Sequence, residues 1–177
     1  LTADIEFSGL TFVPAAGTPA ETVGSAEFAG IFDGNGYQLK HITLGAHNSA
    51  VFIKLGGGGI VRNVGFYKFD KKKSACAAIV KHNYGTVENC LVTGFYNMSG
   101  YGAGLVSNNT QWGVVRNCVI DKISYDSATN NSIFINENSG KVENCLVVNT
   151  KIDTMRRKDT GTSSNLVKAD AWKTAEG

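Results

Sequence analysis

The sequence repeats a short motif at a nearly constant interval. Each copy places an asparagine two residues after a valine, and the copies occupy residues 60–66, 86–92, 114–120 and 141–147. The asparagines are Asn63, Asn89, Asn117 and Asn144, separated by 26 (89−63), 28 (117−89) and 27 (144−117) residues. A period of this length is typical of solenoids and other repeat arrays, and it constrains the fold more than any other feature of the chain.

The alternation of apolar and polar residues breaks at each asparagine. In a strand with a period of two, Val87 faces inward and Glu88 faces outward. The same period would turn Cys90 outward, although a free cysteine is usually buried. We therefore predict a bend at Asn89 and its counterparts, because asparagine tolerates the left-handed backbone conformation. One asparagine per coil would then stack and hydrogen-bond along the axis as a side-chain ladder.

A second set of apolar segments lies about ten residues before each asparagine. These segments are residues 50–55, 77–81, 103–107 and 132–136, and each is followed by a turn rich in glycine or asparagine. Each repeat therefore reads as strand, turn, strand, bend, strand and long loop. The sequence predicts an all-β fold, namely a single-stranded right-handed parallel β-helix of about six coils. The coils are 22–28 residues long, with His41 at the asparagine position of the first one (63−41).

We expect the 177 residues to form one domain. Residues 1–27 would be an entry strand and a loop, and residues 28–152 the regular coils. Residues 153–177 are expected to form a long polar loop, one more first strand at residues 165–168, and a cap.

Two further columns follow from stacking the repeats. The residues before the asparagines are Arg62, Glu88, Arg116 and Glu143, which would form an outward column of alternating charge. The residues after three of them are Cys90, Cys118 and Cys145, which would stack inside as free thiols. Neighbouring in-register strands offer poor disulfide geometry, and no cysteine or histidine spacing resembles a zinc site. We therefore expect no metal and no cofactor.

Composition narrows the choice of partners. The net charge of +2 argues against a nucleic-acid partner, and no run of about 18 apolar residues is present to insert into a membrane. The chain begins inside a strand-like pattern, so we expect it to belong to a larger polypeptide or assembly.

The loops after the third strands are the candidate binding region, because function usually lies in loops carried by a rigid scaffold. They cover about residues 70–77, 97–104, 126–132 and 154–165. Tyrosines at their edges and basic residues within them are suited to hold a glycan or an acidic host surface. The candidate binding residues are Lys71, Lys72, Lys73, Tyr96, Tyr101, Tyr125, Arg156 and Arg157.

Catalytic chemistry has little support in the sequence. Glycoside hydrolysis needs two carboxylates about 5–9.5 Å apart, whereas Asp33, Asp121, Asp153 and the glutamates of the charge column are scattered. Residues 33–36, D-G-N-G, begin like a calcium loop but lack its later ligands, so we interpret them as a turn. The protein is therefore expected not to be an enzyme.

The N-terminal coils resemble a known family. Residues 28–44 read F-x-G-x-F-D-G-N-G-Y-x-L-x-x-I-T-L, and the later coils follow the form apolar–Gly–x–V–x–N–C–x–V. Over about residues 1–152 this pattern is similar to the GLUG-motif repeats of bacterial surface and secreted proteins, including adhesins and regions of IgA-peptidase-type proteins. The three cysteines and the glycine tract at residues 56–59 depart from the family pattern.

The resemblance implies a β-helical stalk or adhesive module on an exported protein. Our leading expectation is thus a non-enzymatic adhesion or binding module, secreted or at the cell surface, that contacts carbohydrate or a host protein. A viral (phage) fibre or capsid-decoration domain in a virion is the alternative, favoured by the unpaired thiols. A polysaccharide-active lyase or hydrolase is the third possibility.

Overall fold

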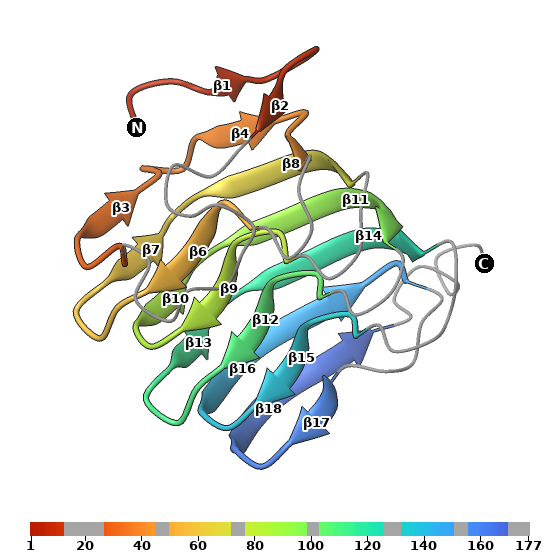
Figure 1. The fold of residues 1–177 in the computed structure, drawn as a ribbon. Helices are drawn as coiled ribbons and strands as arrows, with labels where there is room; N and C mark the ends of the chain where they lie inside the picture. The colour runs from red at the N-terminus through yellow and green to blue at the C-terminus, as the bar shows by residue number, and fades with distance from the viewer. Residues whose placement is uncertain are drawn as a thin grey trace.

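The computed structural model describes residues 1–12, 27–44, 50–71, 77–98, 103–125, 132–150 and 156–169. These residues form strands, turns and bends without a helix. The chain winds through successive coils that stack on one another from the N-terminal end to the C-terminal end (Figure 1). The fold is therefore all-β, as expected.

The coils reuse the same strand positions. The first strands are β6 (Phe52–Leu55), β9 (Val80–Asn83), β12 (Val106–Asn109), β15 (Ile135–Asn138) and β17 (Arg156–Asp159). The second strands are β3 (Ile31–Asp33), β7 (Ile60–Arg62), β10 (Thr86–Glu88) and β13 (Val114–Arg116). The third strands are β4 (Gln38–Lys40) with β5 (Thr43–Leu44), β8 (Gly65–Lys71), β11 (Leu91–Met98) and β14 (Val119–Tyr125). In the last two coils, β16 (Lys141–Val148) and β18 (Thr162–Ala169) combine the second and third positions, while β1 (Ile5–Glu6) and β2 (Thr11–Phe12) cover the first coil.

Every strand pairing is parallel and links equivalent residues of neighbouring coils. Val87 lies opposite Val61 on one side and Val115 on the other, and Val115 lies opposite Val142. The first strands form a five-stranded sheet, and the second and third strands form a 13-stranded sheet that folds around the core. The parallel β-helix predicted from the repeat is confirmed. The coil count differs slightly from the predicted six, because five coils contribute a strand to the smaller sheet, whereas the N-terminal coil contributes only the isolated Phe28–Leu55 bridge among the described residues.

The predicted bend at the motif asparagine is present in successive coils. The φ angles are 54° at Asn63, 52° at Asn89, 52° at Asn117 and 50° at Asn144, all in the left-handed region. The prediction that His41 holds the asparagine position of the first coil is wrong. Lys40 pairs with Tyr67, which places His41 beside Lys68, and Gly36 takes the position of Asn63. A second column of left-handed residues, five positions after the first, comprises His41, Lys68, Gly94, Lys122 and Asn149. The sequence did not indicate this second bend, because no single residue type is common to its members.

The asparagine ladder runs along the outside of that bend. Asn89 donates from Nδ2 to Oδ1 of Asn63, and Asn117 donates to Asn89, each over 3.2 Å. Asn63 donates in turn to Asp33 Oδ1 at 3.1 Å, and Asn165 donates to Asn144 at 2.9 Å. The ladder is solvent-exposed, so each bond is worth only a fraction of a buried one.

A second, buried asparagine ladder was missed by the sequence analysis. Asn83 donates to Asn109 Oδ1, and Asn109 donates to Asn138 Oδ1, both over 2.8 Å. All three side chains are at most 1% exposed. Their strands extend two residues beyond the predicted apolar runs, because these asparagines end the strand with the side chain inward instead of starting a turn.

Glycines make room for the buried ladder. A Cβ atom on Gly113 would overlap Asn109 Oδ1 and would lie 2.5 Å from the carbonyl oxygen of Asn83. Gly85 and Gly140 hold the equivalent place, and their amides donate to the Asn83 and Asn138 side chains over 3.1 and 3.2 Å. The turn glycines of the sequence are therefore needed to let the coils approach each other at this corner.

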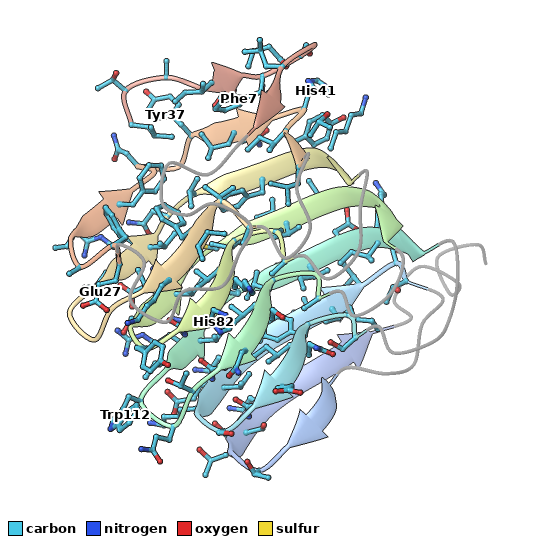
Figure 2. All side chains as sticks on the ribbon, in the orientation of Figure 1. Phe7, Glu27, Tyr37, His41, His82 and Trp112 are labelled. Atoms are coloured by element: carbon cyan, nitrogen blue, oxygen red, sulfur yellow. The ribbon has the colours of Figure 1, made fainter. Side chains whose placement is uncertain are left out.

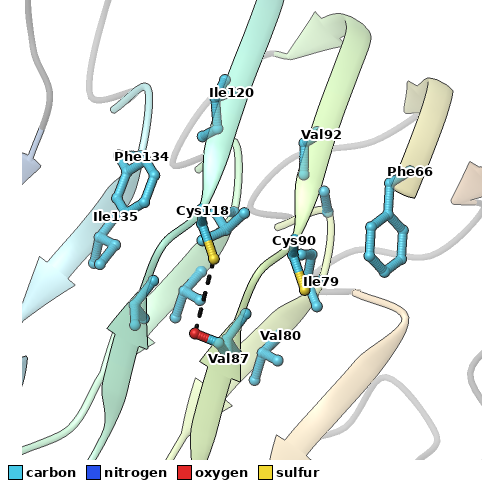
Figure 3. Close-up of a cluster of buried hydrophobic side chains, with 14 of the residues drawn as sticks. Phe66, Ile79, Val80, Val87, Cys90, Val92, Cys118, Ile120, Phe134 and Ile135 are labelled. Atoms are coloured by element: carbon cyan, nitrogen blue, oxygen red, sulfur yellow. Dashed lines mark hydrogen bonds between the residues drawn. The ribbon is translucent and has the colours of Figure 1, made fainter. Parts of the chain in front are cut away.

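The core consists of columns of like residues. Phe66, Val92, Ile120 and Val147 stack from the third strands, and Val80, Val106 and Ile135 face them from the smaller sheet. Cys90, Cys118 and Cys145 belong to the same core as free thiols, at most 2% exposed. Figure 3 shows Cys90 and Cys118 among these side chains. The Cys118 thiol donates to the Val87 carbonyl at 3.8 Å, toward the preceding coil. Cys76 lies outside the described residues.

The charge column stands in register on the outer side of the second strands. Asp33, Arg62, Glu88, Arg116 and Glu143 lie opposite one another in successive coils. Arg116 Nε donates to Glu88 at 2.7 Å, and Arg62 Nε donates to Asp33 at 2.8 Å. Glu143 pairs with Lys141 of its own strand, over 2.8 Å. Asp33 therefore ends a strand, with the turn beginning at Gly34.

Residues 156–169 differ from the expected long loop and first strand. They form β17 and β18, which pair with β15 and β16. Residues 165–168, predicted as a first strand, lie instead in β18 at the second and third positions, where Asn165 sits at the bend with a φ of 52°. Arg156 pairs with Ile135 and Ser163 with Val142, so charged or hydroxyl residues occupy positions that are apolar one coil earlier. The sequence pattern failed here because this coil lacks the apolar alternation, and its strands are specified by pairing with the coil before it.

The buried ladder yields a direct test. Asn109→Ala should lower the free energy of unfolding by about 1–3 kcal/mol, because a buried N–H of Asn83 loses its acceptor and Asn138 Oδ1 loses one of its two donors, the other being the Gly140 amide. Urea denaturation followed by circular dichroism measures the change. Asn108→Ala is the matched control, since Asn108 is in the same strand with its side chain partly exposed, and it should change stability by less than about 0.5 kcal/mol. Equal effects of the two variants would contradict the buried ladder.

Candidate functional site

The predicted loop residues cannot be assembled into a site from the described side chains. Lys72, Lys73 and Tyr101 lie outside the described residues. The other five candidates lie in strands whose backbone is described there without their side chains: Lys71 in β8, Tyr96 in β11, Tyr125 in β14, and Arg156 and Arg157 in β17. Arg156 and Arg157 are thus strand residues, and the loop-binding hypothesis remains a prediction.

Described side chains form an aromatic cluster and a groove on another part of the surface, which we term the narrow face. It comprises the outer side of β3, β7, β10 and β13, each three residues long. At about 3.3 Å per residue the face is about 10 Å wide. One margin is formed by the turns that lead into these strands, and the other by the asparagine bends that follow them.

The turn margin carries an aromatic cluster. Tyr84 and Trp112 come from the turns before β10 and β13, and their rings stack with centroids 6.0 Å apart and planes 21° apart. The Lys54 ammonium lies 5.2 Å from the Tyr84 ring centroid and is paired with Glu27 over 2.9 Å. Trp112 projects from the edge of the solenoid and is 64% exposed (Figure 2). An exposed tryptophan held by a neighbouring ring is a pre-formed platform for a flat apolar ligand surface.

The bend margin carries a groove of about 400 Å³ over the first three coils. Four amide side chains line it, from Asn35, Gln38, Asn63 and Asn89. Gly36, Val64, Gly65 and Leu91 complete the lining. The lining therefore combines hydrogen-bonding amides with small apolar surfaces and contains no ionisable side chain.

The groove arises from an irregularity between coils. Four residues, 34–37, connect β3 to β4, whereas two residues, Asn63 and Val64, connect β7 to β8. The first coil therefore protrudes at this corner and forms a wall above the second. This protrusion packs tightly, because a Cβ on Gly34 would lie 2.5 Å from the Asn63 carbonyl oxygen.

The carboxylates near the narrow face are engaged in ion pairs and hydrogen bonds. Asp33 accepts hydrogen bonds from the backbone N–H of Asn35, the side chain of Asn63 and the guanidinium of Arg62. These contacts, in that order of size, lower the pKa of the Asp33 carboxyl. Glu88 accepts from Arg116, and Glu143 pairs with Lys141. Asp33 and Glu88 therefore link neighbouring coils, whereas the Glu143–Lys141 pair lies within one strand.

Two of the buried thiols, Cys118 and Cys145, resist ionisation. Burial raises the pKa of Cys118 well above its ordinary value. Hydrogen bonding with Cys118, followed by burial, raises the pKa of Cys145. Thiols that resist ionisation are poor nucleophiles and metal ligands. Across the described ranges, no group of three His, Cys, Asp or Glu side chains is placed to hold a metal ion.

The N-terminal cap is fixed by a small polar cluster. Glu6 Oε1 accepts from the Ser8 hydroxyl at 2.6 Å and contacts His41 Nδ1 at 2.8 Å. Hydrogen bonds from the Ser8 hydroxyl and the His41 ring lower the pKa of Glu6 from 4.5 to about 2. Asp4 pairs with Lys40 at 2.7 Å, and its pKa is also lowered, mainly by that contact. The cap is therefore attached to the first coil through ionised carboxylates.

Comparisons with known proteins do not assign the chain to a family: no family model, no curated protein and no solved structure matches it. In the part of the chain that the structure describes, no helix has the length and apolar character needed to span a membrane.

Two groups of site residues were missed by the sequence analysis. Trp112 lies in the polar turn N-T-Q-W-G, where a large apolar residue has no core to join, and that signal was available. The groove had no such signal, because it depends on comparing the lengths of connections in neighbouring coils.

The cap predicts a specific acid sensitivity. The pKa of Glu6 is depressed in the folded state, so its stabilisation is present above pH 4.5 and is lost as the pH falls toward about 2. Glu6→Gln should therefore reduce the hydrogen-exchange protection of the Phe7 amide, which donates to Lys40. The difference from the unmodified protein should be constant above pH 4.5 and disappear near pH 2. A difference that does not change over this range would show that the ionised carboxylate does not fix the cap.

Proposed function

We propose that this chain is a non-enzymatic binding module, secreted or displayed at a cell surface, in which the β-solenoid is a rigid scaffold that binds carbohydrate through Trp112. The exposed Trp112 ring, stacked on Tyr84, is the observation that carries the proposal. We also propose that the chain belongs to the GLUG-motif repeats. The repeated motif around the asparagines supports this assignment.

The aromatic cluster suits a sugar ring. The C–H face of a pyranose is a flat apolar surface that packs against an aromatic face, and its hydroxyl edge remains available for hydrogen bonds. A tryptophan offers the largest such face and loses little conformational freedom on binding. Lys54 and Glu27, which lie beside Tyr84, provide charged hydrogen-bonding groups at the rim.

The scaffold supports the proposal through its rigidity. Trp112 is carried by a turn that begins at Thr110, whose amide and hydroxyl donate to the Asn83 carbonyl over 3.0 and 2.8 Å. The Gly113 amide closes that turn by donating to the Thr110 carbonyl at 2.9 Å. A platform held in this way loses little entropy when a ligand binds, which favours affinity.

A viral fibre or capsid-decoration domain is the second candidate. The supporting observation is that Cys90, Cys118 and Cys145 are buried and unpaired, which suits folding in a reducing compartment. The sequence that flanks this chain in its parent protein distinguishes the two proposals. A secretion signal or a surface anchor supports the adhesion module, and a trimerisation or capsid-binding segment supports the fibre.

The carbohydrate proposal is tested by a glycan panel. We expect at least one glycan class to raise the unfolding temperature, because a ligand that binds only the native state stabilises it. Trp112→Ala should weaken that binding by about tenfold or more, equivalent to about 1.4 kcal/mol, as measured by calorimetry. Leu10→Ala is the matched control, since Leu10 is 60% exposed but lies at the N-terminal cap. Failure of every glycan, or unchanged affinity in Trp112→Ala, would overturn the proposal.

A further inference from the structure

We infer that the groove over the first three coils is a second sugar-binding site, selective for uncharged oligosaccharides that lie along the solenoid axis. This inference rests on the proposed carbohydrate-binding function and adds the site and the substrate class. It uses no residue of the aromatic cluster, because its lining residues come from the bend margin of the narrow face.

The amide ladder gives the groove its hydrogen-bonding capacity. An asparagine side chain has two N–H donors and an oxygen with two lone pairs. In Asn63 and Asn89 the ladder bonds use one donor and one lone pair of each amide. Each therefore offers a donor beside an acceptor at the surface, and a sugar hydroxyl, which both donates and accepts, is complementary to that pair.

Gly65 gives the groove its depth. Gln38, Gly65, Leu91, Val119 and Leu146 occupy the same outward position in successive coils. The backbone does not require a glycine there, because Gly65 is not among the residues with positive φ. The absence of a side chain leaves a notch between Gln38 and Leu91, and the aliphatic stem of Gln38 fills part of it, with Cγ 2.8 Å from where a Gly65 Cβ would be.

The electrostatics indicate a neutral ligand. The groove lining is free of ionisable groups, and the adjacent charged residues are paired, with Arg62 bound to Asp33 and Arg116 bound to Glu88. No uncompensated charge faces the groove from these pairs, so an anionic sugar gains no attraction and loses hydration on entering.

The direction of the groove favours a saccharide over a peptide. Its lining residues belong to three stacked coils, so it runs across the strands and spans about 10 Å at the usual strand spacing. One common mode of peptide recognition adds a strand to an open sheet edge. Here the neighbouring strands β7, β8, β10 and β11 are each paired on both sides. The groove instead presents side-chain amides and a small apolar surface at Leu91, which matches a di- or trisaccharide.

The test uses the whole chain and defined probes. Neutral oligosaccharides, from dimer to hexamer and built of glucose, mannose, xylose or N-acetylglucosamine, are titrated by calorimetry alongside oligogalacturonates as acidic probes. Gly65→Val fills the notch with the residue that Val119 already provides two coils later, so the backbone should accept it once Gln38 moves aside. We expect binding of the preferred neutral sugar to weaken about tenfold or more, and binding in the control Val119→Leu to stay within about twofold.

A second variant guards against a purely structural effect. Gln38→Ala leaves the notch open, removes one amide, and should weaken the same sugar without lowering the unfolding temperature by more than a few degrees. Comparison with Trp112→Ala separates the two proposals. Loss in Trp112→Ala alone overturns the groove and leaves the proposed function standing, whereas loss in Gly65→Val and Gln38→Ala alone supports the groove and overturns the role of Trp112. Preference for oligogalacturonates, or no binding of any probe, overturns the groove site.

Discussion

Parallel backbone hydrogen bonding between one coil and the next is the constraint on which the rest of this structure depends. It places each residue next to its counterpart about 27 positions away in the sequence. Each side chain must therefore pack against the side chain at the equivalent position of the neighbouring coil. Valine on valine, cysteine on cysteine and asparagine on asparagine all meet that requirement. A buried amide is tolerated because it finds an identical amide above and below, as Asn109 does between Asn83 and Asn138.

The same constraint explains where a binding surface can arise. In a regular solenoid, side chains at equivalent positions of successive coils form uniform columns on the surface. A notch or a projecting aromatic ring arises only where one coil differs from its neighbours. The narrow face has such breaks at both margins. The connection of residues 34–37 and the missing side chain at Gly65 interrupt the bend margin, and Trp112 interrupts the turn margin. Neither Gly65 nor Trp112 is explained by packing in the core.

Much of the fold could be predicted from the sequence, because the period of the motif asparagines sets the strand register directly. The bend at Asn89 and the burial of Cys118 followed from one break in alternation. The buried ladder could not be predicted in this way, because Asn109 begins the polar segment N-T-Q-W-G, which local preference assigns to a turn, and stacking overrides that preference. The strand of Arg156 had no apolar pattern to reveal it. Trp112 was visible as an anomaly in a polar turn, whereas the groove required the lengths of neighbouring coils in three dimensions.

The most direct test of the account is to remove one whole coil. Deleting residues 90–117 joins Asn89 to Cys118, which restores the motif and lets Val119 take the place of Leu91 against Gly65. If register between coils specifies the fold, the product is a shorter protein with the same β circular dichroism and a cooperative unfolding transition. Deleting residues 90–103, about half a coil, should instead abolish that transition, because every later column is displaced. If the two deletions unfold the protein equally, register between coils is not what specifies this fold.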